Sequence, residues 1–177
     1  IGTCSPPPMS SDFREVSAQD WQEHLAVGLI SPVEFMKAVV DGMAERGFGR
    51  IVNITTGAAK YPAEVRVLSG PPRAALSNYT TAIAKSLAKH NVIINNLLPG
   101  MHHTAATEKS FGDRAAEQCI SYDELVQEWI DYWRIGANRF GDAEDFGALC
   151  AMLCSSQAGF MVGQDIVVDG GMAGSTF

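Results

Sequence analysis

The sequence lacks several features that would assign it to a class of protein at once. No apolar run approaches the roughly 20 residues needed to cross a bilayer, and no secretory signal is visible at the start. Basic residues are outnumbered 13 to 20, so we expect no binding to nucleic acid or to an anionic membrane. There is no Cys-x-x-Cys pair, and no suitably spaced His or Cys could complete a metal site around Cys150 and Cys154. We therefore expect no metal, and we interpret the cysteines as small apolar residues in a reducing, cytoplasmic environment.

Two glycine motifs are also missing. No Gly-x-Gly-x-x-Gly run is present, so the sequence holds no dinucleotide-binding turn of that kind. The absence of a Gly-x-Ser-x-Gly elbow disfavours a Ser-His-Asp hydrolase. The chain itself has 177 residues, 46% of them hydrophobic and 19% charged, which is typical of one globular domain. It begins with Ile1 rather than Met, which predicts further sequence upstream.

Three short segments rich in β-branched residues predict strands that are buried on both faces of a parallel sheet, at 50–55, 92–98 and 165–169. Amphipathic patterns and capping residues predict helices between them: at 17–46, with either a new start or a kink at Pro32, at 73–89, after Ser121, and from Asp142 to about Cys154. Residues 3–11, 56–69 and 101–120 are expected to be loop or irregular. Strands that alternate with helices indicate an α/β fold with a doubly wound parallel sheet in three layers.

Five segments in this order resemble the short-chain dehydrogenase/reductase family. They are 49–56 (GRIVNITT), 73–88, 91–100, 139–141 and 163–171 (GQDIVVDGG). The resemblance implies that residues 1–177 form the carboxyl-terminal part of a Rossmann-like domain and lack its first four strands. It also implies that NAD or NADP is the cofactor and that most of its site lies upstream. An uncovered edge at 50–55 predicts that the isolated chain is poorly soluble or unstable. The changed catalytic residues described next predict that this chain alone is inactive.

The resemblance places substituted residues at all four of the family's catalytic positions. Thr56 stands where the family has Ser, Ser69 where it has Tyr, Arg73 where it has Lys, and Gly28 where it has Asn. Thr keeps a hydroxyl and Arg keeps a positive charge, although its planar fork reaches differently. Ser69 is the serious loss, because an aliphatic hydroxyl titrates far above a phenol and is a poor acid at neutral pH.

Two nearby groups could replace the missing acid. His102, beside His103, follows Pro99-Gly100, and histidine is a common general acid in enzymes. Tyr61 lies in the loop between Thr56 and Ser69. The alternative is that these are ordinary loop residues. The resemblance further implies that the cofactor contacts a set of residues around the second strand: Arg73, Pro99, Gly100, His102 and Thr104. Thr104 could equally cap the following turn.

Two functions therefore remain open. The first is an oxidoreductase of this family that acts on a small-molecule substrate with altered catalytic residues. The second is a non-catalytic relative that binds a nucleotide or a partner. In either case the resemblance implies a homo-oligomer, formed through the helices at 17–46 and 73–89 and through the last strand with the helix before it.

Overall fold

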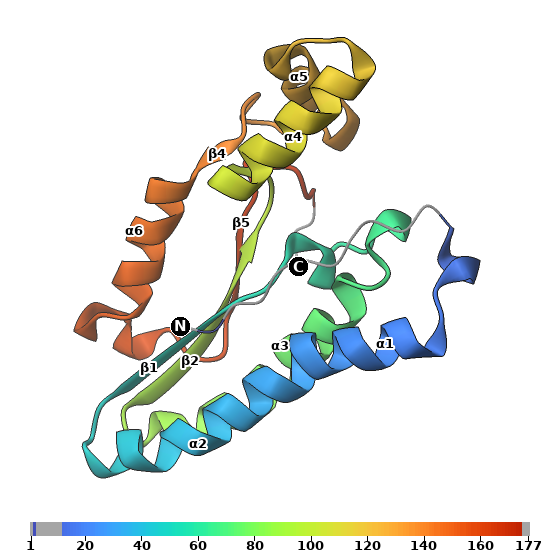
Figure 1. Ribbon diagram of the computed structural model, residues 1–177. Coiled ribbons are helices and arrows are strands. Elements are labelled where there is room, and N and C mark those ends of the chain that lie inside the picture. Colours follow the sequence, from blue (N-terminus) through green and yellow to red (C-terminus); the bar gives the residue numbers. More distant parts are fainter. Residues whose placement is uncertain (1, 3–11, 175–177) are drawn as a thin grey trace.

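A parallel sheet of three strands runs through the middle of the molecule (Figure 1). The computed structural model describes residue 2 and residues 12–174, so Cys4 and the loop predicted at 3–11 lie outside the described residues. The strands are β1 (Gly49–Ile54), β2 (Val92–Pro99) and β5 (Asp165–Val168), in the order β1-β2-β5. Both pairings are parallel, which confirms the three predicted strands and their direction.

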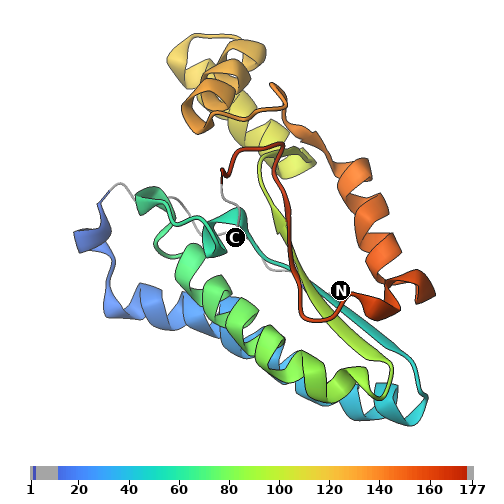
Figure 2. The ribbon, with the colours of Figure 1, turned by 180° about the vertical axis from the view of Figure 1, so that it is seen from behind.

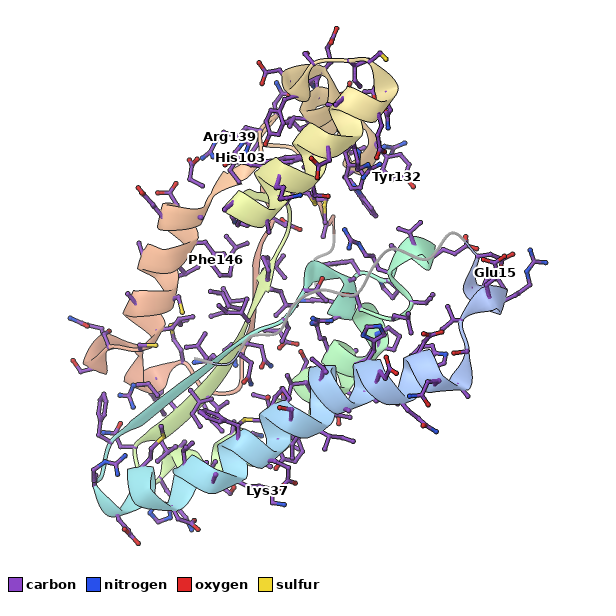
Figure 3. All side chains as sticks on the ribbon, in the orientation of Figure 1. Glu15, Lys37, His103, Tyr132, Arg139 and Phe146 are labelled. Carbon is purple, nitrogen blue, oxygen red and sulfur yellow. The ribbon has the colours of Figure 1, made fainter. Side chains whose placement is uncertain are left out.

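Helices cover both faces of this sheet, as the three-layer prediction requires (Figure 2). On one face, Ile51 and Ile94 pack against α2 (Ser31–Glu45) and α3 (Gly70–Ala88). On the other face, Val52 packs against α6 (Ala143–Leu153), and Figure 3 shows Phe146 on the side of α6 that faces the sheet. Neighbouring strand residues therefore serve opposite faces, as the period of two in a strand dictates.

The buried strands also carry polar side chains, and these pair with one another. Asn53 Nδ2 donates to Asn96 Oδ1 at 3.0 Å, and Asn96 Nδ2 donates to Asp165 Oδ1 at 2.7 Å. These residues are also direct partners in the sheet, Asn53 with Asn96 and Asn96 with Asp165. A slip in register would leave buried amides without partners, so this row of side chains stabilises one alignment of the three strands.

A second group of helices stands beyond the carboxyl ends of the strands. It contains α4 (Ala105–Gln118) and α5 (Tyr122–Trp133), which share a core of Phe111, Leu125 and Phe140. The prediction of irregular chain at 101–120 is therefore wrong for most of that range. The hydroxyl of Thr104 accepts the N–H of Thr107 at 3.1 Å and begins α4.

The first helical segment is continuous but contains one irregular turn. α1 (Ala18–Leu25) begins with the predicted Ser17–Asp20 capping box and passes through a π turn at Ala26–Ile30 directly into α2. Ser31 is helical and does not start a new helix. Pro32 has no N–H for the carbonyl of Gly28, four residues earlier, and the wider π turn accommodates its ring.

Two more helix starts differ in detail from the predictions. α3 begins at Gly70 rather than Arg73, because the prolines after Gly70 suit a first turn that needs no N–H donors. Asp142 precedes α6, but its side chain makes no capping bond and instead accepts from Arg139 Nη1 at 3.2 Å. The capping box at Ser121 and Glu124 is confirmed.

Other features concern edges and cysteines. Gly2 exchanges hydrogen bonds with Val52 (2.9 Å) and Ile54 (2.7 Å), and in the described part of the chain it alone pairs with the outer side of β1. A short parallel pair, β3 (His102–His103) with β4 (Gly141–Asp142), was not predicted.

Cys150 is buried, which raises the pKa of its thiol. Within residues 2 and 12–174, no helix could span a membrane and no cluster of His, Cys, Asp or Glu could hold a metal.

Candidate active site

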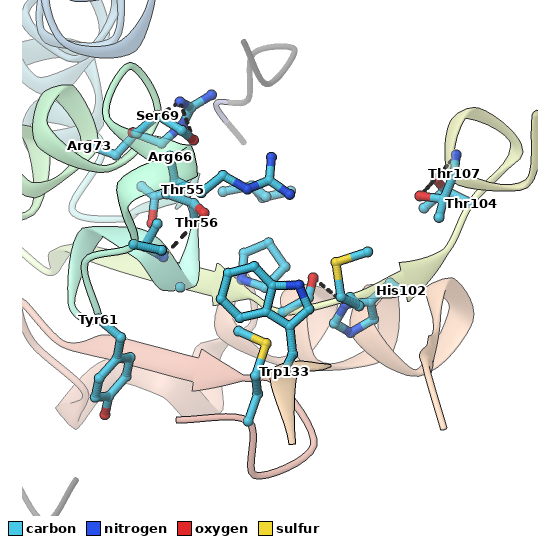
Figure 4. Close-up of a pocket in the computed structure, with 18 residues that line it drawn as sticks. Thr55, Thr56, Tyr61, Arg66, Ser69, Arg73, His102, Thr104, Thr107 and Trp133 are labelled. Atoms are coloured by element: carbon cyan, nitrogen blue, oxygen red, sulfur yellow. Dashed lines mark hydrogen bonds between the residues drawn. The ribbon is translucent and has the colours of Figure 1, made fainter. Parts of the chain in front are cut away.

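A pocket of about 340 Å³ opens at the carboxyl ends of β1 and β2 (Figure 4). Its walls come from the segment after β1, the start of α3, the segment after β2, and Trp133 at the end of α5. Parallel sheets commonly bind ligands outside the carboxyl ends of their strands. The pocket brings together most of the residues that the sequence suggested: Thr56, Tyr61, Ser69, Arg73, Pro99, Gly100, His102 and Thr104.

Ser69 and Arg73 lie in the pocket because α3 begins unusually close to the segment after β1. A Cβ at Gly70 would come within 2.8 Å of the Ala58 carbonyl oxygen, so only glycine permits this approach. Arg73 follows Ser69 by one helical turn, and its Nη1 donates to the Ser69 carbonyl (3.3 Å) and hydroxyl (3.2 Å). Ser69 is 2% exposed and Arg73 4% exposed, so this pair is held in the wall of the pocket.

Two threonines end β1 at the pocket. The Thr56 hydroxyl accepts the N–H of Ala58 at 3.3 Å and starts a short 3₁₀ turn, Gly57–Ala59. The hydroxyl of Thr55 is buried and has no hydrogen-bond partner among the described residues. The same holds for the indole Nε1 of Trp133 on the other side of the pocket, within the described range.

Gly28 lies outside the pocket. It is buried in the π turn, where a Cβ would lie 3.0 Å from Pro72 Cβ at the start of α3. Of the four predicted catalytic positions, Thr56, Ser69 and Arg73 line the pocket and Gly28 does not. The absence of a side chain at Gly28 serves the close packing of this turn on α3.

The segment after β2 is shaped by its backbone. A Cβ at Gly100 would lie 2.6 Å from Asp169 Cβ, and the N–H of Gly100 donates to the Val168 carbonyl at 2.9 Å. Thr104 both lines the pocket and caps α4, so its two predicted roles are compatible. The amino end of the 14-residue helix α4 therefore faces the pocket.

The candidate replacement acids are poorly placed. His102 Nδ1 is 3.3 Å from the Gly100 carbonyl oxygen, and the other side of the ring packs on Gly141 and Phe146. His103 Nδ1 lies 3.1 Å from the Tyr122 hydroxyl, and His103 does not line the pocket. Figure 4 shows Tyr61 at the margin, with its hydroxyl directed away from Ser69 and Arg73.

Sequence reasoning missed Arg66, which ends the short 3₁₀ turn Glu64–Arg66 and extends into the pocket (Figure 4). Burial and then the positive charge of Arg73 lower the pKa of Arg66 below its usual value. No Asp or Glu side chain lines the pocket in the described part of the structure. The wall is thus locally positive in a chain whose net charge is −7.

Comparison with known sequences gives a consistent set of relatives. Residues 1–173 match the family model described as Enoyl-(Acyl carrier protein) reductase. Acetoacetyl-CoA reductase from Cupriavidus necator is 31% identical over 160 residues, which cover 90% of this chain and 60% of that protein. Human dehydrogenase/reductase SDR family member 4 is 27% identical over 164 residues, covering 93% and 55%. The chain thus spans about 60% or less of the length of these relatives.

Solved structures show the same fold. L-sorbose reductase from Gluconobacter frateurii, complexed with NADPH and L-sorbose, has a TM-score of 0.88 at 24% identity, covering 98% of this chain and 66% of that chain. YwfH, an NADPH dependent reductase involved in bacilysin biosynthesis, has a TM-score of 0.84 at 27% identity, with the same coverage. A short chain oxidoreductase from Pseudomonas aeruginosa with an atypical catalytic center has a TM-score of 0.83 at 21% identity, covering 97% and 64%.

Proposed function

Because this chain belongs to the short-chain dehydrogenase/reductase family, we propose that it is part of a nicotinamide-dependent oxidoreductase with altered catalytic residues. The observation that carries the proposal is the pocket in which Thr56, Ser69 and Arg73 meet Pro99, Gly100 and Thr104. The substrate is a small carbonyl or hydroxyl compound. The names of the relatives support this class of reaction, since they are reductases.

The residues of the pocket fit one end of a nicotinamide nucleotide. Gly100 lines the pocket beside Thr104, and the amino end of α4 at Thr104 suits a phosphate because its N–H groups and helix dipole favour an anion. Arg73 adds a positive charge from the opposite wall. When bound, the reduced cofactor would supply a hydride. Pro99, Gly100, His102 and Thr104 would position it.

The catalytic side of the pocket supports only weak proton transfer. Thr56 can donate its hydroxyl to a substrate oxygen, although that hydroxyl also accepts the N–H of Ala58. Ser69 is bonded to Arg73 and is a poor acid. Both ring nitrogens of His102 face the protein, so this histidine is not offered to the substrate.

The second candidate function is a non-catalytic relative that binds a nucleotide. The hydrogen bond between Ser69 and Arg73 favours it, because the two groups that replace the acid and its partner satisfy one another. A nucleotide-binding protein needs the Pro99–Thr104 side of the pocket but not a proton donor.

We further propose a homo-oligomer. Large apolar side chains are exposed on the helical run from α1 to α2 (Val27, Ile30, Phe35) and near α6 (Met152, Phe160). Phe160 is fully exposed, at 100%. Exposed apolar patches on two faces are typical of interfaces. Sedimentation of a monomer at micromolar concentration would contradict this assembly.

Calorimetric titration of NADPH and NADH, together with an absorbance assay of nicotinamide oxidation on a panel of small ketones, tests the function. Cofactor binding with turnover supports the altered oxidoreductase. Cofactor binding without turnover supports the non-catalytic relative instead. If neither cofactor binds, both candidates fail and the family membership reflects ancestry alone.

A further inference from the structure

Arg66 is a charged side chain in the pocket that the family's catalytic positions do not account for. It lies on the segment between Thr56 and Ser69, and Figure 4 shows its guanidinium projecting between the β1 end and the indole of Trp133. Unlike Arg73, it makes no side-chain hydrogen bond or ion pair with any described residue. A half-buried guanidinium of this kind has given up part of its hydration without a protein partner.

Among the described residues that line the pocket with Arg66, none carries a negative charge. The described lining of the pocket has no carboxylate, and the nearest charge of consequence is the like charge of Arg73. An anion beside Arg66 would balance its charge and could accept two parallel N–H bonds from its guanidinium fork.

Two buried donors beside Arg66 point to a ligand independently. The Thr55 residue is 8% exposed, and its hydroxyl has no partner in the described structure. The Trp133 indole N–H is likewise buried and unbonded among the described residues. Buried polar groups are nearly always hydrogen-bonded, so donors from two walls of one cavity indicate that a polar ligand completes it.

We propose that Arg66 binds the carboxylate of a small oxo acid, so that the pocket selects anionic carbonyl compounds over neutral ones. The carbonyl part of this substrate class rests on the proposed function, whereas the anion site does not. A volume of about 340 Å³ suits a small molecule. The assignment to the substrate, rather than to a cofactor phosphate, follows from position: Arg66 lies with Thr55 and Trp133, away from the amino end of α4 (Figure 4).

Binding of acetoacetate, its neutral methyl ester and inorganic phosphate tests the proposal, by calorimetry and by tryptophan fluorescence without cofactor. Arg66→Gln should weaken acetoacetate binding by on the order of tenfold to a hundredfold, as expected for a lost charged hydrogen bond. Arg66→Lys should lose less, and the ester should bind weakly to all forms. Arg46→Gln is the matched control, because Arg46 is exposed at the end of α2. Trp133→Phe should remove most of the fluorescence response.

Four outcomes overturn the proposal. One is acetoacetate binding that Arg66→Gln leaves unchanged in a variant with parental thermal stability. Another is equal affinity for acetoacetate and its ester. The third is phosphate binding that depends on Arg66, combined with a loss of NADPH affinity in Arg66→Gln. This result would assign the site to the cofactor. Arg66-dependent binding of acetoacetate by a protein that binds no nicotinamide would uphold the inference and reject the proposed function. The fourth is turnover of neutral ketones by a protein that does not bind acetoacetate, which would uphold the proposed function and reject the inference.

Discussion

The two sides of the pocket are built in different ways. The side from Pro99 to Thr104 depends on the backbone, because Gly100 packs against Asp169 and Thr104 caps a helix. The side from Thr56 to Arg73 depends on which side chains occupy it, since the backbone there is placed by Gly70 against Ala58. Side chains at Ser69 and Arg73 can therefore change without altering the path of the chain.

This difference explains how chemistry and fold can separate in one molecule. A substitution at Gly100 strains the packing of β2 on β5 and lowers the stability of the fold, so selection for a stable fold acts against it. A substitution at Ser69 changes the acid strength of a single group, so only selection for activity acts against it. When activity is no longer selected, the binding side of the pocket is therefore expected to change more slowly than the catalytic side.

The largest effect is expected from restoring the catalytic side. Ser69→Tyr together with Arg73→Lys should raise hydride transfer to a generic ketone by on the order of 10²-fold or more, because a phenol and an ammonium replace a weak acid and its partner. Steady-state assays of nicotinamide oxidation measure this. Ser69→Phe with Arg73→Lys is the matched control, with the same ring and no hydroxyl. Equal rates for the two double variants would show that the pocket no longer presents a substrate to position 69.

Adding Gly28→Asn to that pair completes the family's set, and the structure indicates a smaller gain. The new Cβ would lie 3.0 Å from Pro72 Cβ, so the start of α3 must shift by a few tenths of an ångström. We expect the triple variant to melt at a lower temperature than the double variant.

An intermediate effect is expected on the binding side. Gly100→Ala places a Cβ 2.6 Å from Asp169 Cβ and 2.7 Å from its Cα, and overpacking of this kind costs about 1–3 kcal/mol. Gly112→Ala in α4 is the control, because nothing lies within 4 Å of that site. It should be neutral or stabilising by up to about 1 kcal/mol. Denaturant unfolding separates the two, and equal stabilities would refute the backbone account of this side.

The smallest effect is expected at Thr104. Thr104→Ala removes the cap of α4 and should cost about 1 kcal/mol of unfolding free energy, whereas Thr104→Ser should retain most of it. If the nicotinamide cofactor meets this end of α4, Thr104→Ala should also weaken its binding severalfold in a calorimetric titration. A loss of stability with unchanged cofactor affinity would restrict Thr104 to the capping role.

The sequence predicted the sheet well because local pattern and burial agree there. Residues 51–53 and 92–98 are buried, as is typical of strands that are covered on both faces of a sheet. Helix α4 escaped prediction because it buries only Phe111 and Ala115 and ends at Cys119 in a left-handed conformation rather than at a glycine. Its start at Thr104 is followed by Thr107, not by the Glu or Gln of a capping box.

The pocket was predicted in part, for a similar reason. Thr56, Ser69 and Arg73 were found through spacing in a chain whose order resembled a known family. Arg66 could not be found in this way, because it lies in a segment without periodicity and meets other pocket residues such as Trp133 only in the folded chain. An arginine in a loop has no local pattern that separates a ligand contact from a solvated side chain.

The π turn at Ala26–Ile30 contains one more residue than an α-helical turn, so it sets which faces of α1 and α2 point the same way. Deleting one residue there would restore the ordinary helical bonding but rotate α1 by about 100° relative to α2. The half-buried Trp21 and Leu25 would then leave the positions that they now occupy. A relative without this turn should carry a one-residue gap at the same point. An alignment that places the gap elsewhere would pair Gly28 with the wrong residue of that relative.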